Sequence, residues 1–199
     1  MDSRIERLIA RIRDAEDALA EEMDARRARF RYRVERGRVI FEKDVRRAHR
    51  EARESLLSFL SRTRPLVVLS APLIYGLIVP LVLLDIFVSL YHAVCFPIYG
   101  IKKVRRADYI AVDRHKLQYL NGLQKLNCVY CGYANGLIAY VREVAGRTER
   151  FWCPIKHATR LKDSHPHYPD FIEFGDAQGF RTRIDRLRAQ RNAPDRDGR

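Results

Sequence analysis

The feature that most constrains this chain is a long run of residues, from Pro65 to Ile101, that contains no lysine or arginine. Its only acidic residue is Asp85. As a single α-helix the run would be about 55 Å long, whereas the hydrocarbon core of a bilayer is about 30 Å thick. Apolar runs of this length are rare in soluble domains. The run is therefore predicted to lie in a membrane, and to bend, tilt or cross it twice.

Three prolines, Pro72, Pro80 and Pro97, lie inside the apolar run. Proline has no backbone N–H and clashes with the preceding helical turn, so each is a point where a helix can break. Pro80 divides the run into halves that would each be about 23 Å long as helices. The sequence therefore predicts a membrane helical hairpin over residues 65–101. A single tilted crossing with an interfacial remainder and a buried hairpin in a soluble domain are the alternatives.

Basic residues flank the apolar run on both sides. Arg62 and Arg64 precede it, and Lys102, Lys103 and Arg105 are among those that follow. Because positive charge beside a membrane segment stays on the cytoplasmic side, both flanks are expected to be cytoplasmic. The residues before the run show no apolar segment typical of a signal peptide, so the run is predicted to be an internal anchor.

The whole chain is basic, with 38 lysines and arginines against 25 acidic residues and a formal net charge of +13. Such a balance is typical of proteins that bind nucleic-acid phosphates or the anionic face of a membrane. The apolar run favours the membrane, and the chain contains no RNA- or DNA-binding motif. Membrane lipids are therefore the expected partner, and nucleic acid is not expected.

Residues 2–29 are predicted to form an amphipathic helix. Their apolar residues recur at alternating steps of three and four, which indicates a coiled-coil seam. The seam consists of Ile5, Leu8, Ile12, Ala15 and Leu19. It is suited to a protein partner or to self-association, and packing against its own domain is the alternative.

A short β-hairpin is predicted near residues 29–42. Phe30, Tyr32 and Val34 alternate with arginines and are followed by Gly37, which is the pattern of two strands around a turn. Residues 42–62 return to a helical pattern that leads into the apolar run.

The residues that look most like a chemical site are Cys128, Cys131, Cys153 and His157. They follow the pattern C-x2-C, then 21 residues, then C-x3-H, which is close to the spacing of a four-ligand metal site. Clustered cysteines in the reducing cytosol are more often metal-binding or redox-active than disulfide-bonded. These residues are predicted to ligate a structural zinc ion. An iron site or iron–sulfur cluster, and a dithiol redox pair or simply buried cysteines, are the alternatives.

Local patterns indicate how the two ligand pairs would meet. The glycine after the C-x2-C pair predicts a knuckle turn, and Asn135 is expected to cap a helix over residues 136–150. Pro154 is expected at a first helical position, which would place Cys153 and His157 on one side of a turn. The helix would then return the second pair to the first.

Other ionisable residues have plainer interpretations. Asp85 and His92, inside the apolar run, are candidate functional groups, although a helix cap or an interfacial position explains them as well. His165 and His167 are candidate substitutes for the His157 ligand, candidate hydrogen-bond partners of a ligand, or exposed loop residues. Cys95 is expected to be a small apolar residue, with S-acylation as the alternative.

Three segments together carry a resemblance to a known family. They are Asp113-Arg-His-Lys, Leu126-Asn-Cys-Val-Tyr-Cys-Gly-Tyr-Ala-Asn-Gly and Trp152-Cys-Pro-Ile-Lys-His-Ala. Through them the chain resembles a family of uncharacterised bacterial membrane proteins, from about Arg29 to Phe180. No activity, cofactor or partner is attached to that family, so the resemblance implies only a bacterial inner-membrane location.

The predicted fold class is mainly α, with a short strand over 107–112 and a helix after Asp113 in the cytosolic part. The predicted parts are a charged helical arm (1–64), the membrane hairpin (65–101), a small α+β metal-binding module (102–180) and a basic, partly disordered tail (181–199).

The predicted function is a membrane-anchored, cytosol-facing metal-binding protein that acts as a binding or scaffolding module. A monotopic membrane oxidoreductase or a lipid-modifying enzyme is the alternative, with Asp85, His92, Asp113 or His115 as acid–base groups. No Ser/His/Asp set or phosphate-binding glycine loop supports that alternative.

Overall fold

The structure, a computed structural model, describes residues 3–28, 32–35 and 38–192. The chain is mainly helical, as predicted. It divides into two compact units: residues 1–63 with 113–129, and residues 64–112 with 130–199.

The first unit contains a long helix, a β-hairpin and two short helices. These elements are α1 (Ser3–Ala28), β1 (Tyr32–Glu35), β2 (Arg38–Phe41), α2 (Lys43–Glu51) and α3 (Leu56–Arg62). The strands pair antiparallel, with Tyr32 opposite Phe41 and Val34 opposite Val39, as the sequence predicts. The predicted turn, residues 36–37, lies outside the described residues.

The helix predicted over residues 42–62 is divided into α2 and α3. The break occurs because the Ser55 hydroxyl accepts the backbone N–H three residues later and so starts α3 as a new helix. His49 of α2 packs edge-on against Phe41 and Tyr119, with ring centroids 5.1 and 5.0 Å apart. These contacts connect α2 to the hairpin and to the segment that precedes α6.

The predicted amphipathic helix forms as α1. Its seam residues Leu8, Ile12 and Leu19 are 49, 58 and 61% exposed. A coiled-coil partner for this seam stays a prediction.

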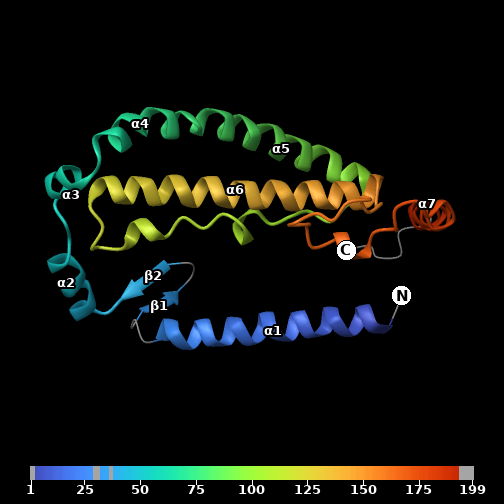
Figure 1. Cartoon of the computed structure of the whole chain (residues 1–199), viewed down its shortest axis with the longest axis horizontal. Helices are drawn as coiled ribbons and strands as arrows, with labels where there is room; N and C mark the ends of the chain where they lie inside the picture. The colour runs from blue at the N-terminus through green and yellow to red at the C-terminus, as the bar shows by residue number, and fades with distance from the viewer. Residues whose placement is uncertain (1–2, 29–31, 36–37, 193–199) are drawn as a thin grey trace. The chain divides into compact units, whose positions relative to one another are not determined.

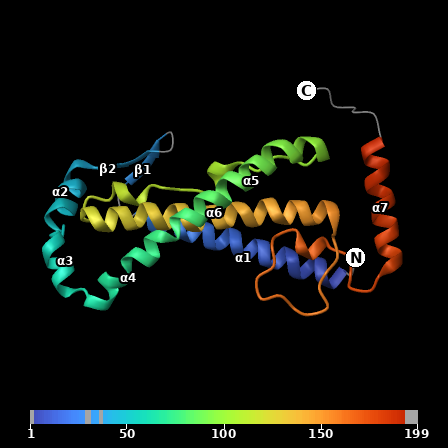
Figure 2. The same cartoon turned by 90° about the horizontal axis from the view of Figure 1, so that it is seen from above.

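The second unit is built on a long apolar helix and a second helix beside it. α4 (Pro65–Gly76) and α5 (Ile78–Tyr99) meet end to end at Leu77, whose backbone stays in the right-handed helical region. Figure 1 shows them as one gently curved rod. Seen from above in Figure 2, this rod crosses obliquely over the part of α6 (Gly122–Trp152) that belongs to the second unit.

The structure therefore does not form the predicted membrane hairpin. The boundary at Leu77 places Pro80 in the first turn of α5, where proline is tolerated. Pro72 and Pro97 are accommodated inside α4 and α5. The described chain contains one helix, Pro65–Tyr99, that is long and apolar enough to cross a membrane by its length and composition.

Gly100 ends α5 and turns the chain back. Its φ of +68° lies in the left-handed region, which glycine adopts without a steric penalty. The Ile101 N–H donates to the Phe96 carbonyl at 2.9 Å, which is a pattern typical of a helix C-terminus with a left-handed glycine. A return segment, residues 101–112, follows. Its second half contains a 3₁₀ turn (Arg106–Asp108) where the sequence predicted a strand.

α6 begins earlier than predicted because Asn121 and Gln124 form a reciprocal cap. The Asn121 Oδ1 accepts the Gln124 N–H, and the Gln124 Oε1 accepts the Asn121 N–H, both at 2.9 Å. The helix predicted over 114–120 is only a 3₁₀ turn (Arg114–Lys116), and Asp113 makes no side-chain cap.

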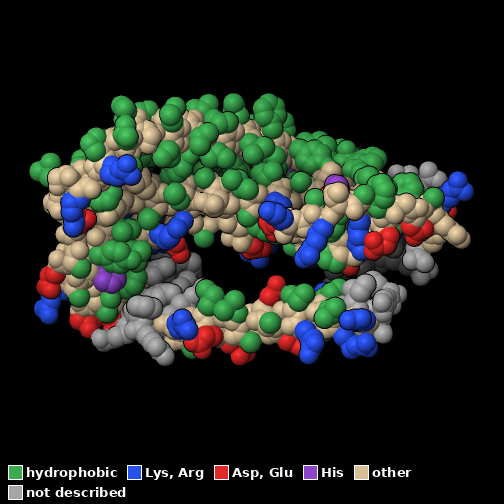
Figure 3. All heavy atoms as spheres, in the orientation of Figure 1, with side chains coloured by type: hydrophobic (Ala, Val, Ile, Leu, Met, Phe, Trp, Pro, Cys, Tyr) green, Lys and Arg blue, Asp and Glu red, His purple; other side chains and the backbone are tan. Residues whose placement is uncertain are grey.

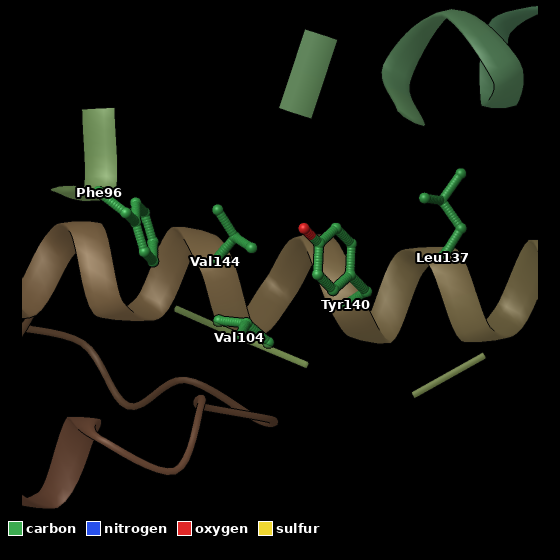
Figure 4. Close-up of a cluster of buried hydrophobic side chains, with 5 residues drawn as sticks. All are labelled: Phe96, Val104, Leu137, Tyr140 and Val144. Carbon is green, nitrogen blue, oxygen red and sulfur yellow. The ribbon is translucent and has the colours of Figure 1, made fainter. Parts of the chain in front are cut away.

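The core of the second unit lies where α5, the return segment and α6 meet. Its buried side chains, shown in Figure 4, are Phe96, Val104, Leu137, Tyr140 and Val144. Gly136 of α6 permits the close approach of the return segment. A Cβ at this position would lie 2.8 Å from both the Ile110 Cα and the Tyr109 carbonyl oxygen.

After α6 the chain forms a loop and a last helix, α7 (Ala177–Asn192). The loop is held by a parallel bridge between Ile155 and Ile172, and it contains a 3₁₀ turn (Tyr168–Asp170). The disorder predicted beyond Asn192 concerns residues outside the described part of the chain.

Candidate functional site

The four predicted metal ligands lie on α6 or beyond its end. Cys128 and Cys131 are inside the helix and form no knuckle turn, and the predicted cap, Asn135, donates to the Cys131 carbonyl at 3.0 Å within it. Cys153 follows the helix end at Trp152. At 1.5 Å per residue, α6 separates Cys131 from Cys153 by about 30 Å, whereas ligands of one zinc lie about 2 Å from it. The structure does not bring the two pairs together.

The second pair also lacks the predicted helical turn. Pro154 is buried in a segment without helix, and the His157 ring stacks on Tyr168 with centroids 5.9 Å apart. All four cysteines, Cys95 included, are free thiols. Among the described residues, no group of three or more His, Cys, Asp and Glu side chains is arranged to hold a metal ion.

Asp85 connects α5 to the return segment and to α6. Arg106 donates to both carboxylate oxygens, the Tyr133 hydroxyl donates at 2.8 Å and the Ser89 hydroxyl at 3.1 Å. The Asp85 side chain is 14% exposed and the Arg106 side chain 43%. The Arg106 guanidinium also lies 5.8 Å from the centre of the Tyr140 ring. Asp85 is therefore a structural anchor rather than a helix cap.

His92 also makes contacts that hold the second unit together. Its Nε2 accepts the Val104 N–H at 2.9 Å, and its ring packs edge-on against Phe96 with centroids 4.6 Å apart. The residue is buried. His92 therefore fixes the start of the return segment against α5.

The C-terminal half of α6 carries a polar cluster that the sequence did not reveal. The buried carboxylate of Glu143 accepts from Arg147 Nε at 2.7 Å and from His167 Nε2 at 3.1 Å. One turn and a half further on, Glu149 accepts from His165 Nε2 at 3.0 Å. The two histidines are therefore half-buried and bound to α6, not exposed in their loop.

Gly146 allows the histidine loop to approach α6. A Cβ at this position would lie 2.9 Å from Cγ of the His165 ring. The His165 ring is held at both nitrogens, because its Nε2 lies 3.0 Å from the Glu149 carboxylate and its Nδ1 accepts the His167 backbone N–H at 3.2 Å. A glycine in the middle of a helical pattern indicates such an approach, and it was the available sequence signal.

The pKa of Glu143 is set by opposing effects. Burial raises the pKa, but the hydrogen bonds and positive charges of Arg147 and His167 lower it more, so the pKa lies below its usual value. A depressed carboxylate pKa stabilises the folded state at pH values above the unfolded pKa, near 4.5, and that stability is lost as the pH falls through the folded pKa.

Replacing Glu143 with glutamine is expected to weaken this dependence on pH. At pH 7, Glu143→Gln should lower the free energy of unfolding in a mild detergent by about 1–3 kcal/mol, since Arg147 loses its carboxylate. As the pH falls below 4.5 and through the lowered folded pKa of Glu143, the two proteins should converge, because the wild-type carboxylate becomes protonated. Thermal unfolding between pH 3 and 8 measures the difference, and a gap that stays constant with pH would contradict the assignment.

A basic pocket of about 440 Å³ lies beside this cluster. Its lining residues are Ile101, Lys102, Arg147, Arg150, Phe151, His167 and Arg183. Arg147 is held in place by Glu143 and by donating Nη1–H to the Lys102 carbonyl at 2.7 Å. In the part of the chain that the structure describes, no acidic side chain forms an ion pair with Lys102, Arg150 or Arg183.

An aromatic cluster joins this pocket to the end of the apolar helix. Tyr99, the last residue of α5, stacks on Phe151 with centroids 5.4 Å apart and an interplanar angle of 16°. Trp152 packs edge-on against both rings. The pocket therefore opens where the apolar surface of α5 ends.

The site has two components. One is a pocket whose Lys102, Arg150 and Arg183 form no ion pair with a described residue, and the other is a histidine–glutamate cluster that fixes one wall of the pocket. Comparisons of the whole chain with the profiles of protein families, with curated proteins and with solved structures find no match to it.

Proposed function

We propose that this protein is anchored to a membrane through α4 and α5 and acts there as a binding or scaffolding module. The observation that carries the proposal is the exposed apolar surface of these helices. None of their most apolar 18-residue stretch is buried, and Figure 3 shows apolar side chains covering both helices. Soluble proteins rarely expose a continuous apolar surface of this size, and hydrocarbon would remove it from water.

The two faces of α5 differ in a way that favours a position along the membrane surface. At least half of each of the outward side chains is exposed: Leu83, Ile86, Phe87, Leu90, Val94 and Ile98. On the opposite face, Asp85 and His92 are bound to the rest of the unit. We therefore propose that the outward face enters one leaflet and that α6 faces the headgroups and water.

Charges on α6 support this position over a crossing. The Tyr91 hydroxyl of α5 lies 3.0 Å from the Thr148 hydroxyl, so the end of α5 runs beside Glu143 and Arg147. A perpendicular crossing would carry these charges into hydrocarbon at a cost of several kcal/mol each. The joined helices also measure about 50 Å, well beyond the 30 Å core.

The basic residues on both flanks of the apolar run support a cytoplasmic location for the polar layer, at a bacterial inner membrane. The zinc and iron hypotheses do not enter this proposal, because α6 holds Cys131 about 30 Å from Cys153. A redox role for the dithiol pair of Cys128 and Cys131 stays a prediction. An interaction of α1 with a partner helix stays a prediction.

Labelling of single cysteines tests the anchor and its orientation. In a chain whose four cysteines are replaced by alanine, Ser61→Cys and Lys103→Cys place one thiol at each flank. We expect a membrane-impermeant maleimide to label both from the same side of sealed vesicles. Phe87→Cys on the outward face should be protected until detergent is added, whereas Leu161→Cys in the exposed loop should react at once.

Opposite sidedness of the two flanking thiols would show that the helix crosses the membrane, and would overturn the in-plane position. Recovery of the unmodified protein in the soluble fraction would overturn the anchor itself.

A further inference from the structure

The basic pocket has the composition of a phosphate site. Lys102, Arg150 and Arg183 come from the return segment, α6 and α7, and none has an acidic partner among the described residues. Bringing three such charges to one pocket costs free energy through repulsion, unless an anion occupies it. Guanidinium groups bind phosphate oxygens through paired, charge-assisted hydrogen bonds, which makes arginine the usual residue for this ligand.

The fourth cation of the pocket is already fixed in position. Arg147 is held by the buried carboxylate of Glu143 and by the Lys102 carbonyl, so little side-chain entropy is lost when it meets a ligand. His167, bound to the same carboxylate through Nε2, stands beside it in the pocket wall. The site is therefore built from groups that the fold has preorganised.

The position of the pocket indicates the source of the phosphate. Phe151 lines the pocket and belongs to the aromatic cluster with Tyr99 and Trp152 at the end of α5. Tyrosine and tryptophan concentrate at the level of the lipid headgroups, where an apolar segment leaves the membrane. The apolar walls, Ile101 and Phe151, suit the glycerol and first methylenes of a lipid.

We propose that this pocket binds the phosphate group of an anionic phospholipid, with Lys102, Arg147, Arg150 and Arg183 as its ligands. The choice of a lipid as the source of the phosphate rests on the proposed membrane anchor, whereas the phosphate chemistry rests on the pocket alone. The site would allow the protein to bind anionic phospholipids selectively in the leaflet on which it lies.

Binding is measured in maltoside detergent, which carries no phosphate, so that the outcome does not depend on how the protein sits in a bilayer. Trp152 is the only tryptophan of the chain and packs edge-on against Phe151, which lines the pocket, so its fluorescence is used to report binding. The probes are short-chain phosphatidic acid, short-chain phosphatidylcholine and inorganic phosphate. We expect phosphatidic acid to bind at least about tenfold more tightly than either of the others.

The test variant is Arg150→Gln/Arg183→Gln, which removes two cations that form no ion pair with a described residue. Its affinity for phosphatidic acid should fall at least about tenfold, because charge-assisted hydrogen bonds are lost. The control, Arg160→Gln/Lys162→Gln, removes the same charge from the exposed loop and should leave the affinity within about twofold. Lys102→Gln, from a different element, should weaken binding in the same direction.

The outcomes separate the parts of the proposal. Equal losses of affinity for phosphatidic acid in the test and control variants would show that the lipid binds to general surface charge, and would overturn the site. Inorganic phosphate binding as tightly as the lipid, with the same sensitivity to the variants, would overturn the lipid source and keep the phosphate chemistry. Lipid binding in detergent together with flanks labelled from opposite sides would overturn the in-plane anchor and keep the site.

Discussion

Gly136→Val is expected to lower the free energy of unfolding by about 3 kcal/mol, near the upper end of overpacking effects. A Cβ at this position would meet the Ile110 Cα and the Tyr109 carbonyl oxygen at 2.8 Å. Both contacts are backbone atoms, so no side-chain rotation relieves them. The return segment would have to move away from α6, opening the core around Tyr140 and Leu137. Denaturant unfolding in a mild detergent measures the loss.

Gly76→Val provides the matched control for this substitution. Gly76 ends α4, and a Cβ there would have no neighbour within 4 Å. Because valine and glycine differ by only a few tenths of a kcal/mol in helix propensity, the control should be close to neutral. Similar losses in the two variants would show that the close approach of backbone at Gly136 does not determine the cost.

Arg106→Ala is expected to cost about 3–5 kcal/mol, since it leaves the Asp85 carboxylate, 14% exposed, without its cation. Asp85→Ala should cost less, because the Arg106 side chain is 43% exposed and can turn to water. The double variant Asp85→Leu/Arg106→Leu should recover most of the loss, as replacing a buried ion pair by apolar side chains is often nearly neutral. A double-mutant cycle on unfolding free energies, closed by Asp85→Ala/Arg106→Ala, gives the coupling.

The adjacent arginine is the control for this pair. The Arg105 Nε lies 3.8 Å from the Asp108 Oδ1, and the two side chains are 80% and 55% exposed. Arg105→Ala should therefore change the free energy of unfolding by less than about 1 kcal/mol. If Arg105→Ala and Arg106→Ala cost the same, the Asp85 pair is not the anchor of the return segment.

The composition of the chain was sufficient to predict the apolar helix and the helical character of its flanks. A segment without lysine or arginine between Pro65 and Ile101 has few physical alternatives, and α1 and the β-hairpin follow from periodicity. The number of breaks was not predictable in the same way. The residue type of Pro80 alone indicates a break in the helix, but in the first turn of α5 a proline is compatible with a nearly continuous helix.

The metal prediction depended on spacing alone, and spacing is ambiguous between a knuckle and a helix. Cys128 and Cys131 are as compatible with one face of α6 as with a turn around zinc. The decisive signal was the cap formed by Asn121 and Gln124, an N-x-x-Q pattern that starts the helix before the first cysteine. Recognising it would have placed both cysteines inside one continuous helix.

The polar cluster and the basic pocket were not predictable, because their members come from distant parts of the sequence. In the sequence, Glu143 and Arg147 have the spacing of an ordinary exposed i, i+4 ion pair on a helix. In the structure, His167 also binds the Glu143 carboxylate. Arg183 lies in a basic tail whose position no local pattern defines. Only the tertiary fold shows that these charges share one surface.

The contacts of α5 determine when the helix can pack after it is synthesised. The described groups that bind the polar side chains of its inner face lie later in the chain: Arg106 pairs with Asp85, Val104 binds His92, and Tyr133 and Tyr140 follow on α6. Since translation proceeds from the N-terminus, the apolar helix emerges from the ribosome before any of these partners exists. A nascent chain at that stage exposes the apolar outward face of α5 to water. If the proposed anchor holds, delivery to lipid therefore precedes the completion of the fold.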